Sequence, residues 1–367
     1  MDNGIKNKPK FAVLGAGHGG LAMAGHLALM GFDVNLYNRS EERLWGVKSM
    51  GGITLVGEVE GFASIGVVSN NIEQVIKDVD IIMVVVPATA HRFIAEQCAK
   101  HLKDGQIVIL NPGRTFGALE FKQVIIKAGI TADVIISEAQ TFIYASRVVG
   151  PGQAHIFKIK NSIPVASVRA YLIPKVLEKL RHAYPQFVAG DNIFKTSFEN
   201  IGAVFHPTIC VMNAGWIEDD AEFQFYLEGV TESVGRVLEK VDCERVKVAE
   251  SLGIRAISAK EWLYLAYGAH GNSLREAMKA NPGYRGIMAP NRLTIRYISE
   301  DVPSSLVPIS SIGKKFGVAT PTIDSIIKIA STINDVDYWE TGRTVEKLQI
   351  QDLTLRELRM LAIGEKL

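Results

Sequence analysis

The start of the chain changes between two patterns of hydrophobic positions. Residues 11–14 form an apolar run of strand length, residues 21–30 repeat apolar positions at helical spacing, and residues 33–37 form a second strand-length run. This order predicts a β-α-β unit. Between the first strand and the helix stands Gly-Ala-Gly-His-Gly-Gly, which fits the pattern Gly-x-Gly-x-x-Gly. In this position the pattern is typical of a dinucleotide-binding loop. The alternative is a glycine-rich turn in a sheet that binds no nucleotide.

Each glycine of this loop has its own expected role. Gly15 allows a tight turn, Gly17 lets a pyrophosphate approach the backbone, and Gly20 lets the helix pack closely on the strand. The start of the helix then offers free N–H groups to the phosphates. His18 belongs to the same predicted cofactor-binding loop. For its side chain we favour the alternative of an exposed loop residue without a specific role.

Three later apolar runs extend the predicted sheet. Residues 80–86, 106–110 and 134–136 are almost continuously apolar, as in parallel strands that are buried on both faces. Further strand patterns lie within 51–69, at 155–159 and at 164–168, and helical patterns lie at 71–78, 90–102, 120–128 and 172–183. This alternation indicates an α/β domain with a Rossmann-type, mostly parallel sheet. His91, in the helical stretch 90–102, is interpreted as a surface residue.

Open α/β sheets bind their ligands beyond the carboxyl ends of the strands. By this rule the residues expected to border the cofactor are Pro87, Ala88, Asn111 and Gly113. Glu138 and Thr141 follow the run 134–136 and are expected to contact the substrate. A role in helix capping is an equally weighted alternative for both.

The end of the second predicted strand bears on the choice of cofactor. About 20 residues after the first glycine, NAD-binding proteins usually carry an acidic residue that binds the ribose 2′-hydroxyl. This chain has Asn38, Arg39 and Ser40 there instead. A guanidinium can bind a 2′-phosphate through two hydrogen bonds. The sequence therefore favours NADP and leaves NAD as the alternative.

The pattern changes near Asn192, where strand-length runs end and helical periodicity takes over. We therefore expect two domains, a dinucleotide-binding domain over 1–191 and an all-helical substrate domain over 192–367. Within the second, residues 196–214 predict a helix that Pro207 should kink. Residues 224–252 predict a long amphipathic helix, which could support a homodimer.

Other signals mark the starts of helices in this half. Ser258 and Ser273 each precede a glutamate by three residues, as in a capping box. Pro303 and Pro321 are expected to begin helices over 303–316 and 321–333. The connector before Pro303 is rich in arginine and includes Arg292, Arg296 and Asp301. These charged residues are candidates for binding anions and for orienting a base. From spacing alone, the favoured alternative is a surface salt-bridge segment.

Composition limits the classes of function. The chain has 367 residues, a formal net charge of +1 and 47% hydrophobic residues, which predicts a globular protein without a basic surface for nucleic acid. Because the sequence contains neither a membrane-length apolar run nor a leader pattern, we expect a cytoplasmic protein. Its three cysteines, Cys98, Cys210 and Cys243, are scattered, so reduced thiols are expected and no metal site is predicted.

Several motifs together resemble one family. They are Gly15–Gly20, Val85–Ala88, Ile109–Gly113, Gly117–Glu120, His206-Pro207, Tyr226–Gly229, Glu239–Asp242, Tyr284–Gly286, Arg296-Tyr297 and Glu300–Val302. In this order they resemble the opine dehydrogenases, the family of octopine and nopaline dehydrogenases and of bacterial N-(1-D-carboxyethyl)-L-norvaline dehydrogenase, to which the likeness is greatest. The resemblance covers essentially the whole chain. The sequence departs from that last relative at Asn38 and Arg39, where the relative carries acidic residues, and this puts NAD in doubt.

The resemblance implies a fold, a reaction and a set of residues. It implies a Rossmann domain joined to an all-helical domain with the active site in the cleft between them, and the reductive condensation of an α-keto acid with an amino acid by NAD(P)H. By matching position, His206 corresponds to the catalytic histidine and Asp301 to the carboxylate that pairs with it. Arg296 corresponds to the arginine that binds a substrate carboxylate. Hydride addition to an imine requires a proton at nitrogen, which a histidine can deliver near neutral pH.

Two other functions remain open from the sequence. A ketopantoate or glycerol-3-phosphate type of dehydrogenase combines similar domains but relies on a lysine, for which Lys195 is the nearby candidate. A protein that senses nucleotides without turnover could also keep this fold. The retention of His206, Arg296 and Asp301 favours the opine dehydrogenase.

Overall fold

The computed structural model describes residues 8–219 and 221–364, which form two compact units. Within these ranges the first unit contains residues 8–113, 117–196 and 360–364, and the second contains 114–116, 197–219 and 221–359. The short segment 114–116 therefore leaves the first unit and joins the second. The domain limits expected from the sequence, 1–191 and 192–367, stay a prediction.

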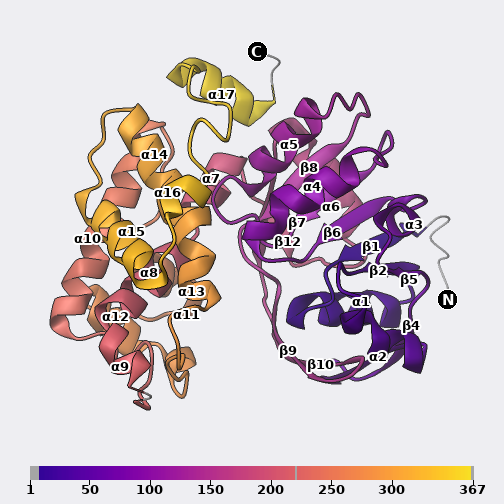
Figure 1. Ribbon diagram of the computed structural model, residues 1–367, viewed down its shortest axis with the longest axis horizontal. Helices are drawn as coiled ribbons and strands as arrows, with labels where there is room; N and C mark the ends of the chain where they lie inside the picture. Colours follow the sequence, from indigo (N-terminus) through magenta and orange to yellow (C-terminus); the bar gives the residue numbers. More distant parts are fainter. Residues whose placement is uncertain (1–7, 220, 365–367) are drawn as a thin grey trace. The chain divides into compact units, whose positions relative to one another are not determined.

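The first unit is built on an eight-stranded sheet in the order β12-β11-β8-β7-β6-β1-β2-β5 (Figure 1). Its strands are β1 (Phe11–Leu14), β2 (Val34–Tyr37), β5 (Val68–Ser69), β6 (Ile81–Val84), β7 (Ile107–Leu110), β8 (Ile135–Ala139), β11 (Ile163–Ser167) and β12 (Phe187–Ala189). Neighbouring strands are parallel except β8 and β11, which are antiparallel. The expected mostly parallel sheet is thus confirmed. Because β1, β6 and β7 are neighbours, their carboxyl ends lie side by side.

A second sheet of the same unit has four strands in the order β4-β3-β10-β9. These strands are β3 (Gly52–Gly57), β4 (Gly61–Ser64), β9 (Tyr144–Gly150) and β10 (Gln153–Ile159). The helices of the unit are α1 (His18–Leu29), α2 (Glu42–Met50), α3 (Ile72–Ile76), α4 (His91–Ala99), α5 (Gly117–Lys127) and α6 (Ile173–Leu180), and α7 (Ile193–Phe198) leads from the first unit into the second.

Helix α1 connects the two sheets of the first unit. It packs against β1 and β2 of the large sheet and against β3, β4, β9 and β10 of the small one. Leu21, Leu27, Ile53 and Leu55 are buried in this contact, and each side chain of this size contributes about 1.5–3 kcal/mol by its burial. Gly25 allows the close approach, since a Cβ there would lie 2.9 Å from Ile53 Cγ2. The glycine loop is therefore followed by a firmly held helix.

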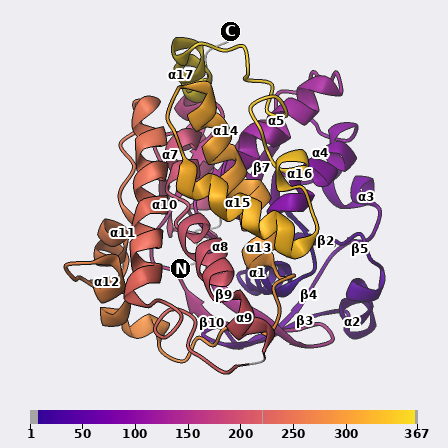
Figure 2. The same ribbon diagram turned by 60° about the vertical axis from the view of Figure 1, so that its left-hand side comes forward.

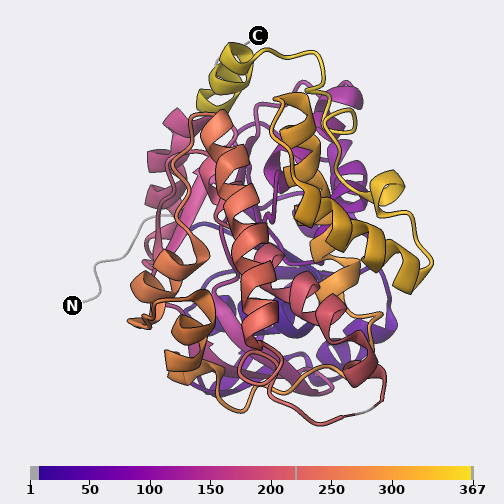
Figure 3. The ribbon, with the colours of Figure 1, turned by 90° about the vertical axis from the view of Figure 1, so that its left-hand side faces the viewer.

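The second unit is helical (Figures 2 and 3). Its helices are α8 (Gly202–Met212), α9 (Ala214–Glu218), α10 (Glu232–Ser251), α11 (Ala259–Tyr267), α12 (Leu274–Ala280), α13 (Arg296–Ser299), α14 (Val307–Lys315), α15 (Pro321–Asn334) and α16 (Tyr338–Thr341). Helix α17 (Leu355–Ile363) begins in the second unit and ends in residues of the first. Helix α10 is central and packs against α8, α12, α14 and α15. This arrangement confirms the all-helical second half.

The predicted helix over 224–252 is wrong in its first part. Helix α10 begins only at Glu232, where the Thr231 side chain accepts a hydrogen bond from Val234 N. The residues before it pair instead with a distant segment, since Phe225 N donates to Ile287 O at 2.8 Å. The apolar residues near Val230 continue the periodicity of α10, but their backbone groups are not helical.

Three other predictions also need correction. The expected helix over 196–214 is divided into α7 and α8, because the buried guanidinium of Arg245 binds the carbonyl of Phe198. Pro303 does not begin an α-helix but lies in a π-helical turn, Val302–Leu306, that leads into α14. His91 is fully buried rather than on the surface, and it packs against Gly117 at the start of α5.

The capping box predicted at Ser258 is confirmed, and the one predicted at Ser273 is confirmed only for the serine side chain, because the Glu276 carboxylate accepts from Asn272 N instead. The Ser258 side chain and Glu261 form a complete capping box at the start of α11, and Ser273 accepts a hydrogen bond from Glu276 N at the start of α12. In the part of the chain that the structure describes, none of the helices is both long and apolar enough to cross a membrane.

Candidate active site

His206 lies in α8, inside the second unit, and both nitrogens of its ring have partners. Nδ1 lies 2.7 Å from Asp301 Oδ2, and Nε2 lies 3.0 Å from the hydroxyl of Tyr226. One face of the ring stacks on Tyr297, with centroids 4.3 Å apart. Pro207 follows directly, and because it has no N–H it interrupts the helical hydrogen bonding beside the histidine. The side chain of His206 remains 17% exposed.

Asp301 is the fully buried partner of His206. Its other oxygen, Oδ1, lies 3.1 Å from Arg114 Nη1, close enough for an ion pair although off the axis of a hydrogen bond. Burial acts to raise the pKa of Asp301, but Arg114, the hydrogen bond from His206 and the charge of Arg296 outweigh it and lower that pKa. Asp301 is therefore a carboxylate that only accepts hydrogen bonds, and Nδ1 of His206 carries a proton.

Arg114 is a site residue that the sequence analysis missed. Its Nε lies 3.3 Å from Glu300 Oε1, so one guanidinium faces two neighbouring carboxylates. Burial acts to lower the pKa of Arg114, but Asp301 and Glu300 raise it. Its backbone has a φ of +57°, which is uncommon for a residue other than glycine. The sequence did contain a hint of its role, because Arg114 directly follows Asn111-Pro-Gly at the end of a predicted strand. In that segment only Asn111 and Gly113 were predicted to be site residues.

The segment around Arg114 is anchored within the second unit. Thr115 N donates to Ser304 O at 3.2 Å, and Phe116 N donates to Ser197 Oγ at 2.9 Å. Arg343, which is buried, donates through Nη1 to Thr115 O at 3.0 Å. These contacts hold the arginine beside the carboxylates.

Tyr226 was also missed, although its motif contributed to the family resemblance. The residue is 7% exposed and stacks on Tyr284 with centroids 4.2 Å apart, and its ring meets Phe225 edge to face at 5.0 Å. Its hydroxyl faces Nε2 of His206. Tyr226 and His206 are twenty residues apart, and the segment between them is not one regular helix. The sequence therefore has no periodic pattern that would predict their contact.

The two arginines predicted to bind anions are exposed, whereas Asp301 is buried. Arg296 is the first residue of α13 and is exposed, and its charge acts on Asp301. Arg292 is exposed in the loop that precedes α13. Because the charge of Arg296 acts on Asp301, its exposed guanidinium is suited to bind a carboxylate from solution close to His206 and Asp301. Their roles stay predictions.

In the first unit, the glycine loop has the geometry that a dinucleotide requires. Gly15 has a φ of +117°, and a Cβ there would lie 2.3 Å from Val85 O. A Cβ on Gly20 would lie 1.7 Å from Gly15 O. At Gly17, by contrast, the nearest atom to such a Cβ is Arg43 Nη1 at 3.9 Å, so the backbone is open to a ligand. Gly17 precedes α1 and has no side chain that could cap it, which leaves N–H groups for phosphates.

The end of β2 holds basic groups beside this loop. Asn38 supports the loop itself, because its Oδ1 accepts a hydrogen bond from Ala16 N at 3.0 Å. The Arg39 guanidinium lies 5.4 Å from the centroid of Phe93 and is exposed. Arg43, in α2, reaches the neighbourhood of Gly17 and was not singled out from the sequence. Two arginines thus lie on the segment that follows β2, and one of them, Arg43, approaches the glycine loop.

The remaining cofactor candidates lie at the strand ends but differ in exposure. Pro87 is exposed and Ala88 is buried after β6. After β7, Asn111 is buried and its Nδ2 donates to Ile109 O at 2.8 Å. His18 is exposed as the first residue of α1, and its Nδ1 accepts a hydrogen bond from Val148 N at 2.9 Å. This contact joins α1 to β9.

The contacts of Glu138 match the capping alternative. It is 1% exposed, its Oε2 accepts from Ala118 N at 2.9 Å at the start of α5, and its Oε1 accepts from Thr196 Oγ1 at 2.7 Å. Gly113 makes room for it, since a Cβ there would lie 2.3 Å from Glu138 Oε2. Thr141 is half-buried and accepts a hydrogen bond from Lys160 Nζ at 2.7 Å. Its contact with substrate stays a prediction.

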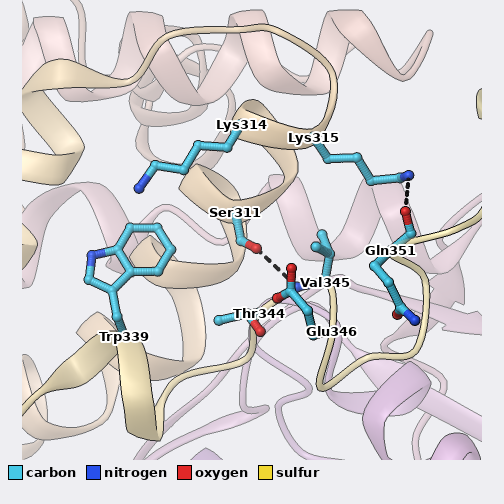
Figure 4. A pocket seen from close by; sticks show the side chains of 8 residues that line it. All are labelled: Ser311, Lys314, Lys315, Trp339, Thr344, Val345, Glu346 and Gln351. Carbon is cyan, nitrogen blue, oxygen red and sulfur yellow. Dashed lines mark hydrogen bonds between the residues drawn. The ribbon is translucent and has the colours of Figure 1, made fainter.

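A separate hollow of about 540 Å³ lies in the second unit, between the end of α14 and the segment 339–351 (Figure 4). Lys314 and Lys315 stand at its rim, and the Lys314 ammonium lies 3.6 Å from the centroid of the Trp339 ring. Neither His206 nor Asp301 lines it. The residues that line the hollow include no histidine, so the pair of His206 and Asp301 rather than this hollow is the candidate for acid–base chemistry.

Comparisons with known proteins relate this chain to NAD(P)-dependent dehydrogenases. Residues 189–334 match the model of the NAD/NADP octopine/nopaline dehydrogenase alpha-helical domain, and residues 10–116 match the NAD binding domain of 6-phosphogluconate dehydrogenase. The opine dehydrogenase of Arthrobacter sp. (strain 1C) is 38% identical over 350 residues, which cover 95% of this chain and 97% of that protein.

Solved structures show a similar fold. An octopine dehydrogenase with NADH and L-arginine matches with a TM-score of 0.81 and 20% identity, over 98% of this chain and 99% of that one. A yersinopine dehydrogenase with bound NADP⁺ matches with a TM-score of 0.76 and 15% identity, over 98% and 99% of the two chains. At these identities the likeness is one of fold.

Proposed function

We propose roles for individual residues on one premise: this chain belongs to the opine dehydrogenase family. It is an NAD(P)-dependent oxidoreductase that acts on the CH–NH group of a secondary amine. The reaction is the reductive condensation of an α-keto acid with the amino group of an amino acid, and its reversal. The alternatives of a lysine-dependent ketopantoate or glycerol-3-phosphate type of dehydrogenase and of a nucleotide sensor are therefore not retained.

His206 is the proposed acid and base of this reaction, with Asp301 as its positioning partner. When bound, the nicotinamide supplies or accepts the hydride. In the direction of condensation, the nitrogen of the imine gains a proton, and in oxidation it loses one. Asp301 fixes the proton on Nδ1, so Nε2 is the nitrogen of His206 that exchanges the proton. The observation that carries this proposal is the 2.7 Å contact between Nδ1 and a fully buried carboxylate.

Arg296 and Arg292 are the proposed carboxylate-binding residues. The keto acid and the amino acid each bring a carboxylate, and a guanidinium binds such a group in a fixed orientation. Arg296 adjoins Tyr297, which stacks on His206, so a carboxylate on Arg296 would hold the reacting carbon near the imidazole. Thr141 is proposed as a further substrate contact. Glu138 is proposed to support the site by capping α5 rather than by binding substrate.

The proposed cofactor is NADP, held by the glycine loop and by arginines at the end of β2. Asn38 replaces the acidic residue that NAD usually requires, and Arg39, Arg43 and Ser40 provide two cations and a hydroxyl for a 2′-phosphate. The residues at the ends of β6 and β7, including Pro87, Ala88, Asn111 and Gly113, are proposed to line the nicotinamide side. A homodimer and a cytoplasmic location remain predictions.

The experiment that tests the role of His206 compares two histidine variants. We expect His206→Ala to lower kcat by about 10²- to 10⁴-fold, the usual contribution of a general acid or base, and to leave the affinity for the cofactor nearly unchanged. The control is His270→Ala, which removes an exposed histidine of the same unit. Coupled turnover of pyruvate with a panel of amino acids, followed as loss of NADPH or NADH, measures both. Near-normal turnover by His206→Ala would contradict the assignment.

A further inference from the structure

The nitrogen of His206 that must exchange a proton is already occupied by a tyrosine. Nδ1 faces Asp301 at 2.7 Å, and Nε2 faces the hydroxyl of Tyr226 at 3.0 Å. An imidazole nitrogen has a single direction, in the plane of the ring, along which it gives or takes a proton. One face of this ring is also covered by Tyr297. A substrate nitrogen could therefore reach Nε2 only by displacing Tyr226, or it could exchange the proton with the Tyr226 hydroxyl instead.

The surroundings of Tyr226 oppose its displacement. Phe225 N donates to Ile287 O and Ala289 N donates to Phe223 O, both at 2.8 Å, so the backbone before the tyrosine is paired with a neighbouring segment. The ring of Tyr226 stacks on Tyr284. Tyr284 is itself only 7% exposed. It lies in a turn in which the side-chain oxygen of Asn281 accepts a hydrogen bond from Gly283 N at 3.0 Å. Moving the hydroxyl of Tyr226 would break this stack and its packing.

The protonation state of Tyr226 suits a group that passes protons on. Burial, with further effects of Tyr297, Tyr284 and Asp301, raises the pKa of Tyr226 well above its usual value. The hydroxyl therefore stays neutral throughout the working range of pH. A neutral hydroxyl can donate one hydrogen bond and accept others at the same time. It can donate to Nε2 when His206 is neutral, and it can accept from Nε2 when His206 is protonated.

We infer that the Tyr226 hydroxyl relays the proton between Nε2 of His206 and the nitrogen of the substrate. This inference rests on the proposed role of His206. In the reductive direction the hydride adds to the imine carbon and the electron pair of the C=N bond moves to nitrogen. That nitrogen takes the proton of the Tyr226 hydroxyl, while the phenolic oxygen takes the proton of Nε2. The tyrosine is unchanged at the end, the imidazolium has become neutral imidazole, and oxidation follows the same path in reverse.

The first test needs neither substrate nor cofactor. In the free protein, nitrogen-15 NMR of the histidine rings reports which nitrogen is protonated and which accepts a hydrogen bond. We expect Tyr226→Phe to shift the Nε2 resonance of His206 toward that of a nitrogen without a donor, and to leave the proton on Nδ1. Tyr338→Phe is the control, because it removes a buried hydroxyl that Asn334 Nδ2 contacts at 2.8 Å in another part of the same unit. An unchanged Nε2 resonance in Tyr226→Phe would contradict the contact on which the relay depends.

The second test measures the chemical step. We expect Tyr226→Phe to lower the rate of hydride transfer in a single turnover by about 10²-fold, as for the loss of a general acid, with KM changed less than about threefold. In the unmodified enzyme, a proton relay predicts that two protons move together, so the rate should depend on the fraction of D₂O along a curve rather than a line.

The outcomes separate the relay from the role of His206. If Tyr226→Phe keeps its rate and binds substrate more tightly, the tyrosine merely occupies Nε2 until the substrate replaces it, and the relay is wrong. A linear dependence on D₂O in the unmodified enzyme would lead to the same conclusion even if Tyr226→Phe failed to fold. Loss of activity in His206→Ala together with normal activity in Tyr226→Phe would overturn the relay and leave the proposed function intact.

Discussion

Arg114 Nη1 lies 3.1 Å from Asp301 Oδ1, on the side of the carboxylate opposite to His206. A fully buried carboxylate is thus held between the permanent cation of Arg114 and the imidazole of His206. The guanidinium lowers the pKa of Asp301 and so favours its charged form. Loss of that cation should affect both the stability and the pH dependence of the enzyme.

For Arg114→Gln we expect a loss of about 3–5 kcal/mol in the free energy of unfolding, the usual cost of leaving a buried charge without its partner. Urea denaturation at neutral pH measures this loss. Arg236→Gln, which removes an exposed arginine of α10, should change it by less than about 1 kcal/mol. Equal stability of the two variants would show that Arg114 does not balance the charge of Asp301.

Asp301 should make the enzyme sensitive to acid. Its pKa in the folded protein is lowered from the ordinary value of 3.8, although burial acts in the opposite direction. Such a group contributes stability that is fully present above its unfolded pKa and is lost as the pH falls through the folded one. We expect the urea midpoint of the native enzyme to fall below about pH 4 more steeply than that of Asp301→Asn. If the urea midpoints of the native enzyme and of Asp301→Asn fell equally with decreasing pH, the prediction would be wrong.

The two arginines near the glycine loop should discriminate between cofactors. We expect Arg39→Ala and Arg43→Ala each to raise KM for NADPH by about 10-fold or more, since a hydrogen bond to a charged group contributes about 1.5–3 kcal/mol. KM for NADH should change less than about twofold. Arg181→Ala, which removes an exposed arginine of the same unit, is the control. An enzyme that prefers NADH before any substitution would contradict the NADP proposal.

Glu138 offers a test between capping and substrate binding. If it caps α5, Glu138→Gln should lower the free energy of unfolding by about 1–3 kcal/mol, because a buried charged acceptor of two hydrogen bonds is replaced by an amide. KM for the amino acid should then stay within about twofold. A rise in KM without loss of stability would instead support contact with the substrate.

The sequence was most informative where structure depends on local patterns. The order strand, glycine loop and helix predicted the tight turn at Gly15 and the close packing at Gly20, because the steric demands of that turn are local. The pairing of His206 with Asp301 came from the family resemblance, since nothing in the spacing of the two residues predicts a 2.7 Å contact.

Long-range contacts explain what could not be predicted. Arg114 follows a strand of the first unit, and only the hydrogen bonds around Thr115 show that it belongs with the helices of the second. The helical periodicity of residues 224–252 was misleading before Glu232, because pairing of Phe225 with Ile287 replaces helical hydrogen bonds there. Tyr226 lies in that misjudged stretch, so its approach to His206 was hidden as well.

The membership of residues 114–116 in the helical unit limits how the protein can be divided. A gene fragment that begins at residue 197 would encode His206, Tyr226 and Asp301 but not Arg114. Its product would carry the dyad with an unbalanced negative charge in its interior. Functional dissection of this enzyme therefore requires a circularly permuted or spliced design that returns the short arginine-bearing segment to the helices.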